Sequence, residues 1–102
     1  MAATDREYVF AALADPTRRG ILRILGERNS ATAGALAAEF SDMTRAAVSA
    51  HLRVLRNAGL VEEKREGQYR VYSLGPSRAD EVVSFLTEVY KRSPTEPRAD
   101  NA

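Results

Sequence analysis

Residues 44–58 form the segment that most limits how this chain can fold. At the angular period of an α-helix, Val48, Leu52 and Leu55 fall on one side, and small or polar residues fall on the other. A three-residue turn separates this segment from a shorter apolar pattern at 33–40 that also has helical spacing. Two helices joined by such a turn are typical of a helix-turn-helix.

The period of the sequence changes directly after this segment. Gly59 stands where a left-handed residue commonly ends a helix. Residues 61–65 and 69–74 then have the composition of two β-strands, and Gly67 supplies the turn between them. A β-hairpin that follows the second helix of a helix-turn-helix indicates a winged helix.

The other helices are predicted from capping residues and apolar spacing. The expected helices are 5–14, with Thr4 and Glu7 as a capping box; one from Pro16, capped by Asp15 and ending near Gly26 or Asn29; 33–40, capped by Thr32; 44–58, capped by Thr44; and 78–91, capped by Ser77. The expected fold is therefore mainly α with a β-hairpin wing, about five helices in the order α-α-α-α-β-β-α.

Length and composition limit the other possibilities. A chain of 102 residues forms one domain, which we expect at 1–92, and the aperiodic segment 93–102 is expected to be a disordered tail. There is no cysteine and a single histidine, so disulfides, zinc fingers and thiolate metal sites are excluded. No stretch approaches the roughly 20 apolar residues that span a bilayer. We expect a cytoplasmic protein with no membrane contact.

Charge is unevenly distributed along the chain. The net charge is only +1, but residues 44–72 carry six basic and three acidic side chains, and residues 44–61 carry three arginines and no acid. A solvated helix commonly mixes both signs to form ion pairs along its surface. A basic face without acids favours nucleic acid instead, with arginine and serine reading base edges and alanines allowing close approach.

This pattern predicts a set of DNA contacts. Arg45, Ser49 and Arg53 are expected at base edges, with Ala46 and Ala50 giving close approach. Phosphate contacts are expected from Thr44, Arg56, Lys64, Arg65, Gln68 and Arg70. In the hairpin, we expect the basic side chains to face the DNA and Glu62, Glu63 and Glu66 to face away.

Three further polar residues have two interpretations each. His51, at the edge of the apolar face, is either a partly buried side chain with one satisfied nitrogen or a phosphate contact. Arg18 and Arg19 either contribute surface charge or have a function, which is a phosphate contact or a brace to the helix at 44–58. The sequence offers no nucleophile beside a base, no phosphate loop and no metal-ligand set, so no enzymatic activity and no cofactor are predicted.

Three motifs in order resemble the ArsR-type winged-helix repressors. They are AALADPTRRGIL at 11–22, TRAAVSAHLRVLRNAGLV at 44–61 and REGQYRVY at 65–72. The resemblance covers roughly residues 5–90. It implies a homodimeric repressor whose fourth helix reads the major groove of a DNA operator and whose wing reaches the backbone or minor groove.

The resemblance also implies that the first and last helices form the dimer interface. The apolar residues that this predicts are Tyr8, Val9, Ala12, Val82, Phe85, Leu86, Val89 and Tyr90. The last five form a wide stripe at 82–90, which by itself fits either a dimer contact or the core of the chain.

Metal-sensing members of this family use cysteines, or Asp, His and Glu on the last helix. This chain has no cysteine and no histidine there, so we expect no metal site. The effector stays undetermined. The alternative function is a protein-interaction module that does not bind DNA.

Overall fold

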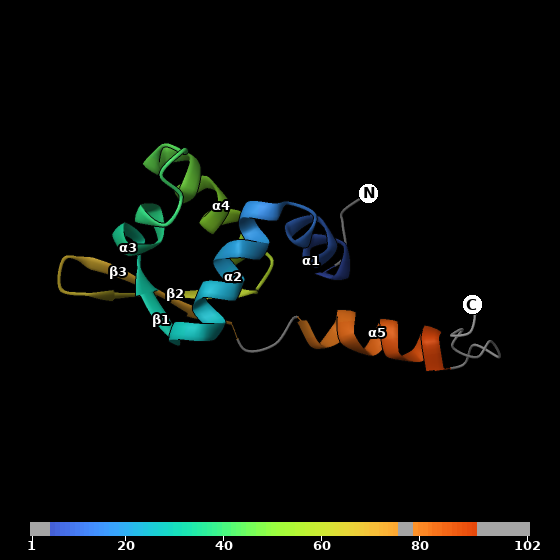
Figure 1. Cartoon of the computed structure of the whole chain (residues 1–102). Helices are drawn as coiled ribbons and strands as arrows, with labels where there is room; N and C mark the ends of the chain where they lie inside the picture. The colour runs from blue at the N-terminus through green and yellow to red at the C-terminus, as the bar shows by residue number, and fades with distance from the viewer. Residues whose placement is uncertain (1–4, 76–78, 92–102) are drawn as a thin grey trace.

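The computed structural model describes residues 5–75 and 79–91. Figure 1 shows its elements, which are α1 (Asp5–Leu13), α2 (Pro16–Arg28), β1 (Ser30–Thr32), α3 (Ala33–Ala38), α4 (Arg45–Asn57), β2 (Val61–Glu66), β3 (Tyr69–Leu74) and α5 (Ala79–Lys91). The expected winged helix-turn-helix is confirmed. Three predictions lie outside the described residues: the caps at Thr4 and Ser77 and the disordered tail at 93–102.

The helix starts follow the predicted caps. The Asp15 carboxylate accepts the backbone N–H of Arg18, and the Thr32 and Thr44 hydroxyl oxygens accept those of Ala35 and Ala47, all at 3.0 Å. Each cap satisfies a backbone donor that has no partner within its own helix.

The structure decides between the two expected ends of α2 and corrects the expected end of α3. α2 continues through Gly26 to Arg28, and Asn29, one of the two expected stops, caps it with a φ of 74° and donates its N–H to the Leu25 carbonyl. α3 ends at Ala38 and not near Phe40. Glycine lowers helix stability only modestly, so the core contacts of Ile21 and Leu25 carry α2 past Gly26.

The sheet contains one strand that the sequence did not predict. β1 pairs antiparallel with β3, with Thr32 opposite Val71, and β3 also pairs with β2, giving the order β1-β3-β2. Three residues are too few for an alternating pattern, so only the pairing with a distant strand defines β1.

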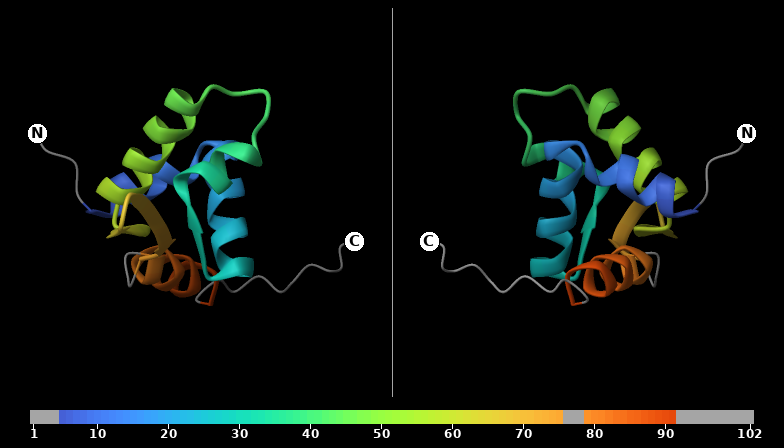
Figure 2. Two further views of the ribbon diagram at one scale, coloured as in Figure 1. Left: turned by 90° about the vertical axis from the view of Figure 1, so that its left-hand side faces the viewer. Right: turned by 90° about the vertical axis from the view of Figure 1, so that its right-hand side faces the viewer.

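In the hydrophobic core, one face of each major helix packs against the sheet. Its buried residues are Val9, Ala12, Ile21, Leu25, Leu36, Val48, Leu52, Leu55, Ala58, Leu60, Val61, Tyr72 and Val82. α5 contributes only Val82, and its other large apolar side chains are exposed. Figures 1 and 2 show α5 on the side of the molecule opposite α3 and α4.

None of the helices in the described part of the chain has the length and apolar character that a membrane span requires.

Candidate nucleic-acid interface

The two faces of α4 differ as its helical pattern predicts. Val48, Leu52 and Leu55 are buried in the core. The opposite face exposes Arg45, Ala46, Ala50 and Arg53, with Ser49 half-buried beside them. Core packing on one side therefore holds the helix so that its acid-free side faces solvent.

The hairpin places its charges differently from our expectation. Neighbouring residues of a strand point to opposite faces of a sheet, so Lys64 and Arg65 cannot share one. The register puts Glu62, Lys64 and Glu66 on one face, where Lys64 pairs with Val71. The expectation that basic side chains face one way and acids the other is wrong.

The second face of the hairpin carries two arginines side by side. Arg65 lies directly opposite Arg70, and Glu63 lies opposite Tyr72 on the same face. Like charges in a cross-strand pair repel each other, so this arrangement favours the presence of an anion.

The same face is turned toward α4. Glu63 forms a short ion pair with Arg56 of α4, which links the helix to the hairpin. Burial raises the pKa of the neighbouring Tyr72 hydroxyl, and the negative charge of Glu63 adds to this effect. Arg56, expected at phosphate, is thus directed toward the wing.

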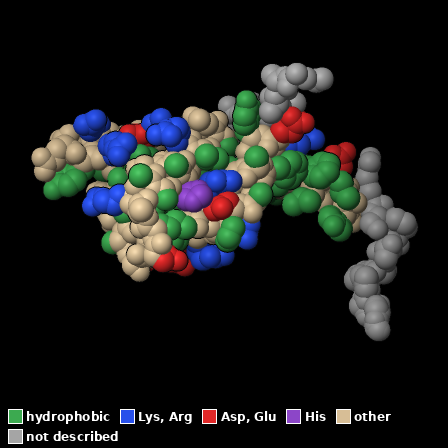
Figure 3. Space-filling view, turned by 90° about the horizontal axis from the view of Figure 1, so that it is seen from above, with side chains coloured by type: hydrophobic (Ala, Val, Ile, Leu, Met, Phe, Trp, Pro, Cys, Tyr) green, Lys and Arg blue, Asp and Glu red, His purple; other side chains and the backbone are tan. Residues whose placement is uncertain are grey.

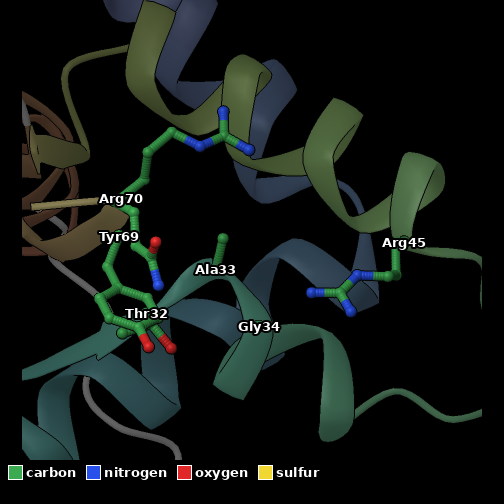
Figure 4. Close-up of a pocket in the computed structure, with 7 residues that line it drawn as sticks. Thr32, Ala33, Gly34, Arg45, Tyr69 and Arg70 are labelled. Carbon is green, nitrogen blue, oxygen red and sulfur yellow. The ribbon is translucent and has the colours of Figure 1, made fainter.

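A shallow pocket of about 230 Å³ lies between the helix-turn-helix and the wing. It is lined by Thr32, Ala33, Gly34, Arg45, Gln68, Tyr69 and Arg70. In Figure 4, Arg45 extends from α4 on one side and Arg70 from β3 on the other, with Gly34 between them. The seven lining residues include two arginines and no acid, which suits an anionic ligand.

Four of these lining residues were missed in the sequence. Thr32, Ala33 and Gly34 sit at the start of α3, where we considered only the cap, and Tyr69 was not among the expected DNA contacts. Tyr69 is in fact 57% exposed. Its position next to Arg70 in a basic hairpin was the one available signal.

Four arginines define what we call the basic surface: Arg45, Arg53, Arg65 and Arg70. Among the described residues, the ion pairs join Arg28 to Glu39 and Arg56 to Glu63, and Nδ1 of His51 lies 3.9 Å from the Asp15 carboxylate; none of these contacts involves the basic surface. In Figure 3, Lys and Arg side chains gather toward the hairpin end, whereas the α5 end is largely hydrophobic.

Arg18 connects three helices behind this surface. Its guanidinium donates to the carbonyls of Ala11 and Ala12 and lies 3.2 Å from Nδ1 of His51. The interpretation of Arg18 as a brace to α4 is confirmed, and so is His51 as a partly buried side chain with one satisfied nitrogen. Arg19 donates to the Leu13 carbonyl at 2.8 Å.

Asp15 makes the start of α2 sensitive to acid. The hydrogen bond from the Arg18 N–H lowers the pKa of the Asp15 carboxyl, and burial opposes this. A carboxyl whose pKa is lowered by folding stabilises the fold above its ordinary pKa of about 3.9, and this contribution is lost as the pH falls through the lower, folded value.

We therefore predict that Asp15→Asn, which keeps a capping oxygen but does not titrate, is less stable than the wild type at pH 7 and approaches it in acid. Urea unfolding at pH 7, 5, 4 and 3 measures this difference. A difference that stays constant from pH 7 to pH 3 would contradict the assignment.

Exposed apolar side chains of α1 and α5 form one surface. Exposed members are Tyr8, Phe10, Val83, Phe85, Leu86, Val89 and Tyr90, and we call this set the α1–α5 face. Phe10, which we did not predict, packs edge-to-face on Phe85 at 6.0 Å between ring centres. Three predicted interface residues, Val9, Ala12 and Val82, are buried in the chain's own core and offer little surface to a second copy.

A helix-turn-helix, a basic reading face and a wing on the same side define a winged-helix DNA-binding protein. Comparisons with known proteins agree. A helix-turn-helix domain family matches residues 13–64. The transcriptional repressor SdpR of Bacillus subtilis is 35% identical over 78 residues, which cover 76% of this chain and 84% of SdpR.

Comparison of this fold with solved structures identifies the family. A crystal structure of an ArsR family transcriptional regulator has a TM-score of 0.78 and 31% identity, and the match covers 89% of this chain and 94% of that one. A homodimeric winged helix-turn-helix DNA-binding domain from Mycobacterium bovis has a TM-score of 0.67 and 28% identity over 85% of this chain and 79% of that one. The chain belongs to the ArsR family of winged-helix transcriptional regulators.

Proposed function

We propose that this regulator is a homodimeric repressor that binds a pseudo-palindromic operator in the cytoplasm and takes no metal or other cofactor. The observation that carries the proposal is the basic surface. Its four arginines come from the exposed side of α4 and from one face of the wing, and within the described residues they have no carboxylate partner. The positive charge of such a surface is unpaired in the protein alone, and DNA phosphates and the acceptor atoms of guanine edges neutralise it.

In this proposal, the exposed face of α4 enters the major groove. Arg45, Ser49 and Arg53 read base edges, and the small side chains of Ala46 and Ala50 let the helix approach the groove floor. The Thr44 oxygen accepts a backbone N–H as the cap, so its hydroxyl hydrogen remains for a phosphate oxygen. The contact continues along the DNA backbone through phosphate contacts from the wing residues Arg65, Gln68 and Arg70.

The α1–α5 face is the proposed contact with a second copy. It gathers large apolar side chains from two helices that pack on each other through Phe10 and Phe85. The homodimeric structure from Mycobacterium bovis, which resembles this chain over most of its length, supports the same occupant. Two-fold symmetry of the protein then calls for two-fold symmetry of the operator.

The proposed independence from metal rests on the sequence. The chain has no cysteine and a single histidine, and that histidine is engaged by Arg18 and Asp15. Among residues 5–75 and 79–91, no three His, Asp or Glu side chains come together as a ligand set. The nature of any inducer is not part of the proposal.

The test begins with selection of duplexes from a random-sequence pool by the full chain. Fluorescence anisotropy then compares the selected duplex with a scrambled one at two salt concentrations, with and without EDTA. We expect specific binding at about 10⁻⁸ M or tighter that EDTA leaves unchanged. Equal, weak, salt-sensitive binding to both duplexes would contradict the proposal and favour an interaction module.

Sedimentation of matched variants tests the dimer. Leu86→Glu places a charge on the apolar stripe of α5, whereas Ser84→Glu adds the same charge to the opposite side of that helix. We expect the first to sediment as a monomer at micromolar concentration and the second as a dimer. A monomeric wild type would contradict the proposed dimer directly.

The two faces of the hairpin provide a further prediction. Arg70→Ala and Lys64→Ala each remove one positive charge, from opposite faces of the wing. Because Arg70 lines the pocket with Arg45, we expect its loss to weaken all duplexes alike and to lower the slope of log K against log salt by about 1. Lys64 lies beside Glu62 and Glu66, so Lys64→Ala should change that slope by less than half as much. Titrations at four salt concentrations measure the slopes of both variants. An equal effect of the two variants would contradict the assignment of faces.

A further inference from the structure

Arg18 sits where the part of the molecule that pairs with a second copy meets the part that reads DNA. Its Nε donates to the Ala12 carbonyl at 2.8 Å, and its Nη2 donates to the Ala11 carbonyl at 3.0 Å. Both oxygens belong to the end of α1. The third nitrogen, Nη1, lies 3.2 Å from Nδ1 of His51, in the middle of α4. A single side chain thus joins α1 to α4.

The chemistry of this contact fixes its direction. A guanidinium only donates hydrogen bonds, so Nδ1 of His51 is the acceptor in this contact. The last carbonyls of a helix have no intrahelical donor, and a cation near them is favoured. The planar fork of arginine serves two such carbonyls and the ring in one rigid geometry, which an ammonium does not reproduce.

The two helices that Arg18 joins, α1 and α4, each carry residues of a proposed binding surface. α1 carries Tyr8 and Phe10 of the α1–α5 face, and Phe10 contacts Phe85 of α5. His51 lies within α4 between the predicted reading residues Ala50 and Arg53. The angle between α1 and α4 therefore decides how the two reading helices of a dimer are set relative to each other.

We propose that Arg18 is a positioning residue that sets the half-site spacing of the operator. By holding His51 to the end of α1, it fixes the tilt of α4 relative to the α1–α5 face. This inference rests on the proposed function, because it requires a homodimer that binds two half-sites. A role in stability alone would weaken binding to every duplex without changing which spacing is preferred.

The first experiment uses the duplex selected by the full wild-type chain and versions with two base pairs inserted or removed between the half-sites. Two base pairs rotate one half-site by roughly 70° about the helix axis. We expect the wild type to prefer the selected spacing by at least ~10-fold. Arg18→Met keeps the aliphatic stem but loses all three donors, and its preference should fall to about threefold or less.

Variants of His51 separate positioning from folding. His51→Leu removes only the acceptor and leaves both carbonyl bonds of Arg18 intact, so it tests the link even if Arg18→Met does not fold. His51→Asn offers an amide oxygen near the place of Nδ1 and should restore the wild-type spacing preference. Circular dichroism and sedimentation check that each variant is folded and dimeric.

A second measurement does not require DNA. Because the chain has no cysteine, Asn57→Cys at the exposed end of α4 takes a single spin label in each subunit. We expect a narrow distribution of label-to-label distances in the otherwise wild-type dimer and a broader one when Arg18→Met or His51→Leu is added.

The outcomes separate the two proposals. Lost spacing preference and broadened distances in Arg18→Met and His51→Leu, with rescue by His51→Asn, support the positioning role. Weaker binding that keeps both the preference and the narrow distances overturns it and leaves the proposed function intact. A wild-type chain that selects no duplex, or is monomeric, overturns the proposed function and this inference with it.

Discussion

Leu52→Ala is expected to lower the free energy of unfolding by about 2–5 kcal/mol, because the truncation removes buried methyl groups and leaves a cavity in a packed core. Leu52 is 2% exposed and lies on the buried face of α4. In a domain of this size each kcal/mol lowers the melting temperature by roughly 4–8 °C, so the expected decrease is about 8–40 °C. Urea and thermal unfolding measure both quantities.

Val54→Ala is the matched control for this prediction. Val54 lies on the same helix but is 37% exposed, so its truncation should cost well under half as much. Below its melting temperature, Leu52→Ala should keep its preference among duplexes, because the side chain does not reach the exposed face of α4. If the two variants were equally stable, α4 would not be anchored as described.

The helices were predictable because their signals are local. Asp15, Thr32 and Thr44 each accept a backbone N–H from a residue three positions later, so the sequence alone contains both partners. The two faces of α4 follow in the same way from the spacing of its apolar residues. Together with the strand composition on either side of Gly67, these signals were enough to predict a winged helix-turn-helix.

Long-range pairing decided what the sequence did not predict. β1 exists because Ser30 to Thr32 pair with β3, some forty positions away, and three residues have no pattern of their own. The faces of the hairpin depend on its register, which places Arg65 opposite Arg70. We assigned charges to faces by their sign, although alternation along a strand forbids that for neighbours.

The candidate site was predictable only in part, for the same reason. The exposed residues of α4 follow from its period, but the pocket joins the start of α3 to the tip of the wing. The links from Arg18 to His51 and from Arg56 to Glu63 join side chains of different elements, so only the assembled fold shows them. For Arg56, this ion pair directs a residue expected at phosphate toward the wing.

Arg53→Ala is expected to weaken binding to the selected duplex by about 1–3 kcal/mol, or roughly 5- to 150-fold, and to relax specificity at one position of each half-site. Arg53 is exposed, and within the described residues it has no carboxylate partner, so its loss should change stability by less than about 0.5 kcal/mol. This result is the reverse of that expected for its neighbour Leu52. The measurement is anisotropy against a panel of duplexes in which each base pair of the half-site is changed in turn.

Arg23→Ala is the control, because it removes the same charge from an exposed position on α2, outside the basic surface. It should leave affinity within about twofold, since a distant surface charge contributes little. The salt dependence then separates two roles for Arg53. A base contact gives unequal losses across the panel, whereas a phosphate contact gives equal losses and a salt slope lower by about 1. Unchanged affinity and specificity in Arg53→Ala would contradict the assignment of α4 as the reading helix, because Arg53 is exposed on the acid-free face that is proposed to enter the groove.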